Sequence, residues 1–253
     1  MRILYLLFFL FSSLAFHAQE NRVIHVFVAL CDNVNQGIVK VPEAIGNGQD
    51  PARNLYWGAG YGVKHFFDKK SSEWTLIKTI KNPETNILER IIFRHSTGTF
   101  LVADAYDGAA MKQTVRDFLN AASGKLPKAI TLEHTTINFG GGADLVAFVG
   151  HNGLMDFELD QRFKGNAGSP KDAIILACYS KNYFQPFLRE ANANPLLWTT
   201  HLMAPEAYTL KAAIDGWIKK ETSEQIRERA AQAYHQYQKC GIKGARNLLV
   251  TGW

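Results

Sequence analysis

The sequence has little of several features that would classify it at once. It contains three cysteines in 253 residues, too few for a framework of disulfides. It has no Cys-x-x-Cys pair, the usual starting point of a structural zinc motif. The formal net charge is +5, but the lysines and arginines are spread along the chain. We therefore expect neither a disulfide-stapled scaffold nor a nucleic-acid partner.

Long apolar runs are confined to the beginning of the chain. Arg2 is followed by the apolar stretch from Ile3 to Phe11, and Ala18 could be the last residue before a cleavage site. Residues 1–18 therefore have the pattern of a secretory signal peptide. The remaining 253 − 18 = 235 residues, 19–253, suit a single domain. No later run is long enough to cross a bilayer, so we expect an exported protein, periplasmic or secreted, without a membrane span.

An odd number of cysteines in an oxidising compartment leaves two possibilities open. The chain could form one disulfide and keep one free thiol, or keep three free thiols. A bridge between Cys31 and Cys240 would leave Cys178 free. A bridge between Cys31 and Cys178 would remove the latter as a nucleophile.

Predicted strands and helices alternate for much of the chain. Apolar runs predict strands at 22–30, 74–80, 87–95, 99–105, 143–150, 172–177 and 196–200, and weaker patterns suggest strands at 131–139 and 244–253. Helical periodicity predicts helices at 52–67, 107–122, about 180–192, 205–220 and onward from Thr222. This order predicts an α/β fold with a mostly parallel, doubly wound sheet flanked by helices.

Two of the predicted strands are each followed directly by a reactive side chain. His151 comes after the apolar run 143–150, and Cys178 comes after the run 172–177. Apart from Asp144 and Asp172 near their starts, both runs are apolar, which is typical of strands covered on both faces. Ligands bind beyond the carboxyl ends of the strands in open α/β sheets. The two side chains could therefore meet over one cleft.

These residue types suit cysteine-dependent acyl transfer. A thiolate at Cys178 would be the nucleophile and His151 would exchange protons. Backbone N–H groups near Asn152, Gly153 and Cys178 could form an oxyanion site. Asp32 and Asn33 follow the first strand at the same edge of the sheet. Either could orient His151 or line the cleft, although solvated turn residues are the simpler interpretation.

The two motifs resemble those of a known superfamily. Leu145-Val-Ala-Phe-Val-Gly-His151-Asn-Gly153 and Ile174-Ile-Leu-Ala-Cys178-Tyr-Ser180 are similar to the motifs of caspase-like cysteine peptidases, which include caspases, legumains and gingipains. The resemblance implies a caspase-like fold, a catalytic His151, a nucleophilic Cys178, no cofactor, and a peptide or protein substrate with a side chain held in a charged or polar pocket. In that superfamily Gly usually follows the His directly, whereas Asn152 intervenes here.

Two alternatives remain open on the residues alone. Cys31, His151 and Cys178 could all lie at one sheet edge, and two thiolates with an imidazole suit zinc. The chain could also be a non-catalytic exported α/β binding module that keeps the caspase-like fold. The positions of His151 and Cys178 relative to each other discriminate between an enzyme and such a module. The sequence does not indicate the oligomeric state.

Overall fold

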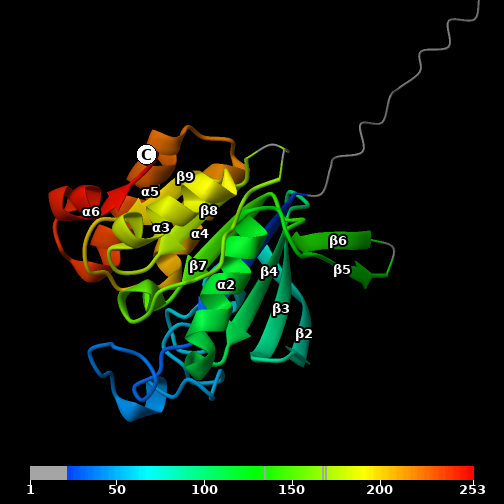
Figure 1. Ribbon diagram of the computed structural model, residues 1–253, viewed down its shortest axis with the longest axis horizontal. Helices are drawn as coiled ribbons and strands as arrows, with labels where there is room; N and C mark the ends of the chain where they lie inside the picture. Colours follow the sequence, from blue (N-terminus) through cyan, green and yellow to red (C-terminus); the bar gives the residue numbers. More distant parts are fainter. Residues whose placement is uncertain (1–21, 134, 167, 169) are drawn as a thin grey trace, which may run out of the picture.

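A computed structural model describes residues 22–253 except 134, 167 and 169. The predicted signal peptide, residues 1–18, lies outside the described residues. An eight-stranded sheet in the order β10-β9-β8-β7-β1-β4-β3-β2 forms the centre of the molecule (Figure 1). Its strands are β1 (Val23–Ala29), β2 (Trp74–Glu84), β3 (Ile87–His95), β4 (Phe100–Tyr106), β7 (Leu145–Val149), β8 (Asp172–Leu176), β9 (Asn194–Thr199) and β10 (Leu249–Val250).

The parallel part of the sheet has a topological switch point. Strands β1, β4, β7, β8 and β9 are parallel to their neighbours in this set, while β2, β3 and β10 pair antiparallel. Numbered along the chain, the five parallel strands have the spatial order 2-1-3-4-5. This is a common doubly wound order, and its ligands bind where the connections from the first strand diverge. In this chain that point lies between β1 and β7.

Helices cover both faces of the sheet. They are α1 (Val63–Lys69), α2 (Met111–Ala122), α3 (Ser180–Ala191), α4 (Ala207–Ile218), α5 (Ser223–Gln238) and α6 (Ile242–Leu248). Helices α2 and α3 lie over the near face in Figure 1, and their buried residues share one apolar cluster with that face. Buried residues of α1, α4, α5 and α6 belong to a second cluster on the opposite face. The predicted α/β architecture, a mostly parallel sheet between helices, is confirmed.

The predicted helix at 52–67 is mostly a series of turns. Only α1 is helical, and it begins at Val63. A Cβ atom on Gly58 would lie 2.1 Å from the carbonyl oxygen of Ala52, and one on Gly62 would lie 2.4 Å from the backbone of Trp57. The turns fold so tightly that these positions require glycine. The alternating glycines therefore mark a compact loop.

Two weaker strand predictions also need correction. The segment predicted as one strand at 131–139 belongs to a hairpin beside the main sheet, formed by β5 (Pro127–Leu132) and β6 (Thr135–Gly140) (Figure 1). The segment predicted as an edge strand at 244–253 is mainly α6, followed by the two-residue strand β10. Short segments with mixed patterns take their conformation from packing against the sheet rather than from local preference.

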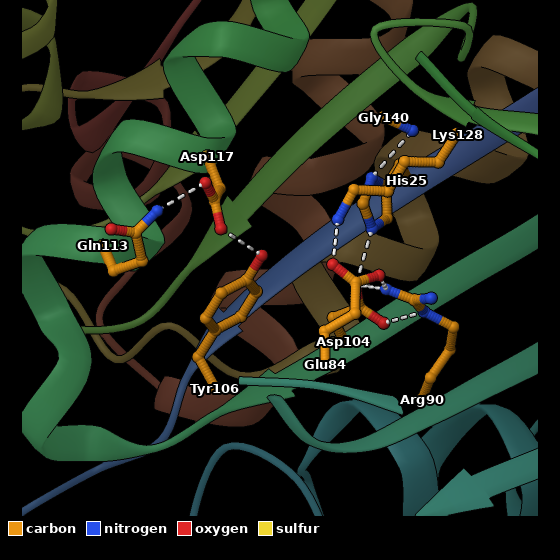
Figure 2. Close-up of polar contacts among 9 residues, drawn as sticks. All are labelled: His25, Glu84, Arg90, Asp104, Tyr106, Gln113, Asp117, Lys128 and Gly140. Atoms are coloured by element: carbon orange, nitrogen blue, oxygen red, sulfur yellow. Dashed lines mark hydrogen bonds and ion pairs between the residues drawn. The ribbon is translucent and has the colours of Figure 1, made fainter. Parts of the chain in front are cut away.

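A buried ionic cluster joins the sheet to this hairpin. The imidazole of His25 lies 3.1 Å from a carboxylate oxygen of Asp104, and Arg90 donates to both oxygens of Asp104 at 2.6 and 2.7 Å (Figure 2). The backbone N–H of Gly140, at the end of β6, donates to Nδ1 of His25 at 3.1 Å. The cluster therefore links β1, β3 and β4 to the hairpin through satisfied polar groups.

None of the helices in the described ranges is long and apolar enough to cross a membrane.

Candidate active site

His151 and Cys178 follow neighbouring parallel strands. Val149, the last residue of β7, is paired in register with Leu176, the last residue of β8. The other neighbour of β7 is β1, so the turn at His151 also lies beside the switch point. The turns after β7 and β8 therefore leave the sheet side by side at its carboxyl edge, as the sequence predicts.

The side chain of Asn152 ties the two turns together. Its amide nitrogen donates to the carbonyl oxygen of Cys178 at 2.7 Å, and its amide oxygen accepts from the N–H of Leu154 at 3.2 Å. Asn152 is fully buried. The residue that separates His151 from Gly153 thus holds the turn at Cys178 in place, a role of its side chain that the sequence does not reveal.

The turn at Cys178 is a sharp strand-to-helix turn. Tyr179 has a left-handed conformation with φ of 50°, and α3 begins at the next residue, Ser180. The buried hydroxyl of Ser180 donates to the carbonyl oxygen of Ile175 at 2.9 Å and lies 3.0 Å from the hydroxyl of Thr199. A non-glycine residue persists in this region of φ only where its surroundings impose it, and such residues cluster at functional sites.

The sulfur of Cys178 contacts both a backbone acceptor and a backbone donor, because its thiol donates to the carbonyl oxygen of Met203 at 3.7 Å. The N–H of Met203 donates to Sγ at 3.4 Å. The amino end of α3 is adjacent in the chain, and a helix N-terminus carries partial positive charge. Cys178 is partly exposed and unpaired. Its thiol is therefore free to react.

A carboxylate that the sequence did not single out orients His151. Nε2 of His151 lies 2.6 Å from Oδ2 of Asp156. The short 3-10 helix Gly153–Met155 reverses the chain and returns Asp156 to the imidazole. The same carboxylate oxygen accepts from the N–H of Gly37 at 3.3 Å. We assign the Nε2 proton to this contact, so that Nδ1 is the unprotonated nitrogen of the neutral ring.

His151 and Cys178 line one pocket of about 260 Å³. Four segments far apart in the sequence form its walls: the loop after β1, the turns after β7 and β8, and the loop between β9 and α4. The other lining residues are Gly37, Ile38, Val39, Tyr56, Gly150, Met155, Leu202, Met203 and Pro205. Both reactive side chains thus line one cleft, and among the described contacts no hydrogen bond joins them directly.

Of the three residues whose N–H groups were expected to form an oxyanion site, only Cys178 lines the pocket, and Asn152 is fully buried. Within the described ranges, the N–H groups of Asn152, Gly153 and Cys178 donate to no protein acceptor. Gly150 precedes His151 with φ of +147°, and a Cβ atom there would lie 2.8 Å from the carbonyl oxygen of Ala29. Glycine at that position lets the turn pass close to the end of β1.

Asp32 and Asn33 hold the loop after β1. Asp32 accepts hydrogen bonds from the N–H groups of Val34 and Asn35 at 2.8 and 3.1 Å. The side-chain amide of Asn33 donates to the carbonyl oxygen of Val41 at 2.9 Å and accepts from the N–H of Val41 at 3.0 Å. Burial alone would raise the pKa of Asp32, but its hydrogen bonds lower that pKa below the usual value. Both residues line a separate hollow of about 510 Å³. The predicted role of orienting His151 belongs to Asp156 instead.

The three cysteines are all unpaired. Cys31 is fully buried, and burial raises the pKa of its thiol to about 11. Burial also raises the pKa of Tyr56. Among the residues that the structure describes, no three His, Cys, Asp or Glu side chains form a group that could hold a metal ion. The proposed zinc trio of Cys31, His151 and Cys178 therefore finds no support in the geometry.

Comparison of the chain with protein-family models, with curated proteins and with solved structures gives no match. The resemblance to caspase-like peptidases therefore depends on the two motifs and on the arrangement of the site itself.

Proposed function

We propose that this chain is an exported cysteine peptidase of caspase-like type that hydrolyses peptide bonds. The observation that carries the proposal is the site at the carboxyl edge of the sheet. There, Cys178 and a His151 oriented by Asp156 line one pocket. A nucleophile, a proton carrier and a group that orients the carrier are the three parts of this kind of catalysis.

In the proposed acylation step, His151 takes the proton of the Cys178 thiol, and the sulfur attacks the carbonyl carbon of the scissile peptide bond. An S–C bond forms and the carbonyl oxygen takes up negative charge. The free N–H groups near Asn152, Gly153 and Cys178 are the donors that would stabilise this oxygen. Protonated His151 then gives a proton to the leaving nitrogen as the C–N bond breaks. The amine product departs and an acyl-enzyme remains.

In the proposed deacylation step, His151 takes a proton from water and the oxygen attacks the acyl carbon. A C–O bond forms, the S–C bond breaks and His151 returns its proton to the sulfur, so that the carboxylic acid product leaves and the thiol is restored. Asp156 stabilises the imidazolium that exists in each step and keeps the ring in one orientation. Every group required belongs to the chain, so the proposal includes no cofactor.

Digestion of a peptide mixture by the purified protein tests the proposal. Mass spectrometry would read the new peptide termini produced by the wild type, by Cys178→Ala and by Cys240→Ser. Cys240 is exposed and lies on the loop between α5 and α6, so it is a matched control. We expect cleavage by the wild type and by Cys240→Ser, and none by Cys178→Ala.

Cleavage that persists in Cys178→Ala would show that another group carries the chemistry. A folded wild type that cleaves no peptide, and whose Cys178 is no more reactive than Cys240, would favour the non-catalytic binding module.

A further inference from the structure

The pocket of His151 and Cys178 is surrounded by apolar side chains that face solvent. Val39 is 93 % exposed, Leu202 is 66 % exposed and Met155 is 40 % exposed, and all three line this pocket. They come from three different segments of the chain. Large apolar side chains that gather on a surface mark a site that binds another molecule, whereas single ones are normal.

Among the residues that the structure describes, no permanently charged side chain lines the pocket. Tyr56 contributes a phenol, and the remaining lining is aliphatic, thioether or backbone apart from His151 and Cys178. The carboxylate of Asp156 is occupied by His151 and by the N–H of Gly37. A charged substrate side chain would therefore lose its water in the pocket without gaining a partner of opposite charge.

The volume of the pocket also limits what enters it. Sites that enclose a whole drug-sized molecule have volumes of about 300–1,000 Å³. At about 260 Å³, this pocket suits one or two side chains of a peptide. The peptide backbone would then lie across the mouth of the pocket, with the scissile carbonyl beside Cys178, which lines it.

We infer that the site takes a peptide with an uncharged, apolar side chain, such as leucine, next to the carbonyl that Cys178 attacks. The inference rests on the proposed function and names its substrate class. It differs from the charged or polar pocket that the resemblance implies. Val39, Met155 and Leu202 are the specificity-determining residues, and they bury their exposed apolar surface when the substrate binds.

Affinity labelling with substrate-like probes tests the inference. Peptidyl chloromethyl ketones that end in leucine, aspartate or lysine would be reacted with the protein, and the modification of Cys178 would be timed by mass spectrometry. In each case the sulfur displaces chloride and forms an S–C bond. Iodoacetamide, which has no side chain, measures the reactivity of the thiol alone. We expect the leucine probe to react about 10- to 100-fold faster than either charged probe, the range that burial of one such side chain produces.

Two valines of one loop provide a matched pair of variants. Val34 is 86 % exposed and Val39 is 93 % exposed, so Val→Asp at either position leaves the core intact. Val39 lines the pocket and Val34 lines the neighbouring hollow. We expect Val39→Asp to slow the leucine probe and to speed the lysine probe, and Val34→Asp to change neither. The iodoacetamide rate of each variant serves as its reference, so that any change in the reactivity of the Cys178 thiol itself is divided out of the probe rates.

The outcomes separate this inference from the proposed function. Faster reaction of a charged probe, with Cys178 still reactive toward iodoacetamide, would overturn the apolar specificity and leave the peptidase intact. Equal effects of the two valine variants would also overturn it. If Cys178 reacts with iodoacetamide no faster than Cys240 does, both proposals fail.

Discussion

At the scale of single residues, the contact between His151 and Asp156 fixes one nitrogen of the imidazole and places a carboxylate beside it. The carboxylate is partly exposed, so Asp156→Asn should cost little stability. Asparagine cannot compensate the charge of an imidazolium, and we expect kcat to fall by about tenfold or more with little change in KM. The pH dependence of kcat should shift as well, a change that a purely structural role would not produce. Peptide hydrolysis measured across pH checks both effects.

Asp160→Asn is the matched control for that variant. Like Asp156, Asp160 lies in the segment between β7 and β8. Its side chain is 86 % exposed and pairs with Arg116, and neither residue lines the pocket. The variant Asp160→Asn should leave the rate of peptide hydrolysis and its pH profile unchanged. If Asp160→Asn and Asp156→Asn have equal effects, Asp156 does not orient the histidine.

His25 carries a separate prediction about stability and pH. Burial lowers its pKa, Asp104 opposes that effect, and Arg90 and Lys128 reinforce it. The folded state therefore binds this proton less readily than the unfolded chain, whose histidine titrates near 6.5. Stability should fall as the pH drops below about 6.5, by up to about 1.4 kcal/mol per pH unit from this group. Urea unfolding between pH 7.5 and 5 measures that slope.

His25→Gln should flatten the slope, because an amide can donate to Asp104 without titrating. Burial also lowers the pKa of His95, but His95 is only partly buried, so His95→Gln should flatten the slope less. An unchanged slope in His25→Gln would refute this account of the cluster.

At the scale of elements, the end of the β5–β6 hairpin depends on one backbone conformation. Gly140 has φ of +59°, and a Cβ atom there would lie 2.6 Å from the carbonyl oxygen of Leu126. We expect Gly140→Ala to lower the free energy of unfolding by about 1–3 kcal/mol. Gly60 has no atom near its would-be Cβ, so Gly60→Ala is the matched control and should have little effect. Urea midpoints that move equally in both variants would contradict this.

The sequence predicts strands correctly where the chain is almost uniformly apolar. It does not predict where a helix begins when tight turns set that point. Strands β1, β7 and β8 are buried along almost all of their length, and their sequences show this directly. The start of α1 depends on contacts of Gly58 and Gly62 with backbone that only the fold brings close. Pro186 lies in the interior of α3, a position that its ring disfavours. The helix continues past it because residues both before and after Pro186, such as Phe184 and Leu188, are buried.

At the scale of the whole molecule, parallel strands explain how much of the site could be predicted. Parallel strands end at one edge, so the sequence could place His151 and Cys178 together. Asp156 could not be found in the same way, because its position depends on the short helix after Gly153 and on the loop at Gly37. The exposed apolar side chains around the pocket, Val39, Met155 and Leu202, likewise come from three segments that meet only after folding.

The buried thiol of Cys31 makes a prediction about global unfolding. Because Cys31 is fully buried and burial raises its pKa to about 11, alkylating reagents should reach it only when the chain unfolds. Labelling of Cys31 in urea should therefore follow the loss of tryptophan fluorescence with the same midpoint. Labelling of Cys31 well before that transition would mean that the loop after β1 opens on its own.

The most direct test of the central claim is the rate at which iodoacetamide modifies each cysteine across pH, compared between the wild type and His151→Ala. The three thiols differ in burial, so Cys240 and Cys31 act as internal references in every sample. The account predicts that Cys178 reacts fastest at neutral pH and that His151→Ala slows Cys178 alone. Slow labelling of Cys178 in the wild type, or a rate that His151→Ala does not change, would contradict an activated pair and with it the proposed peptidase.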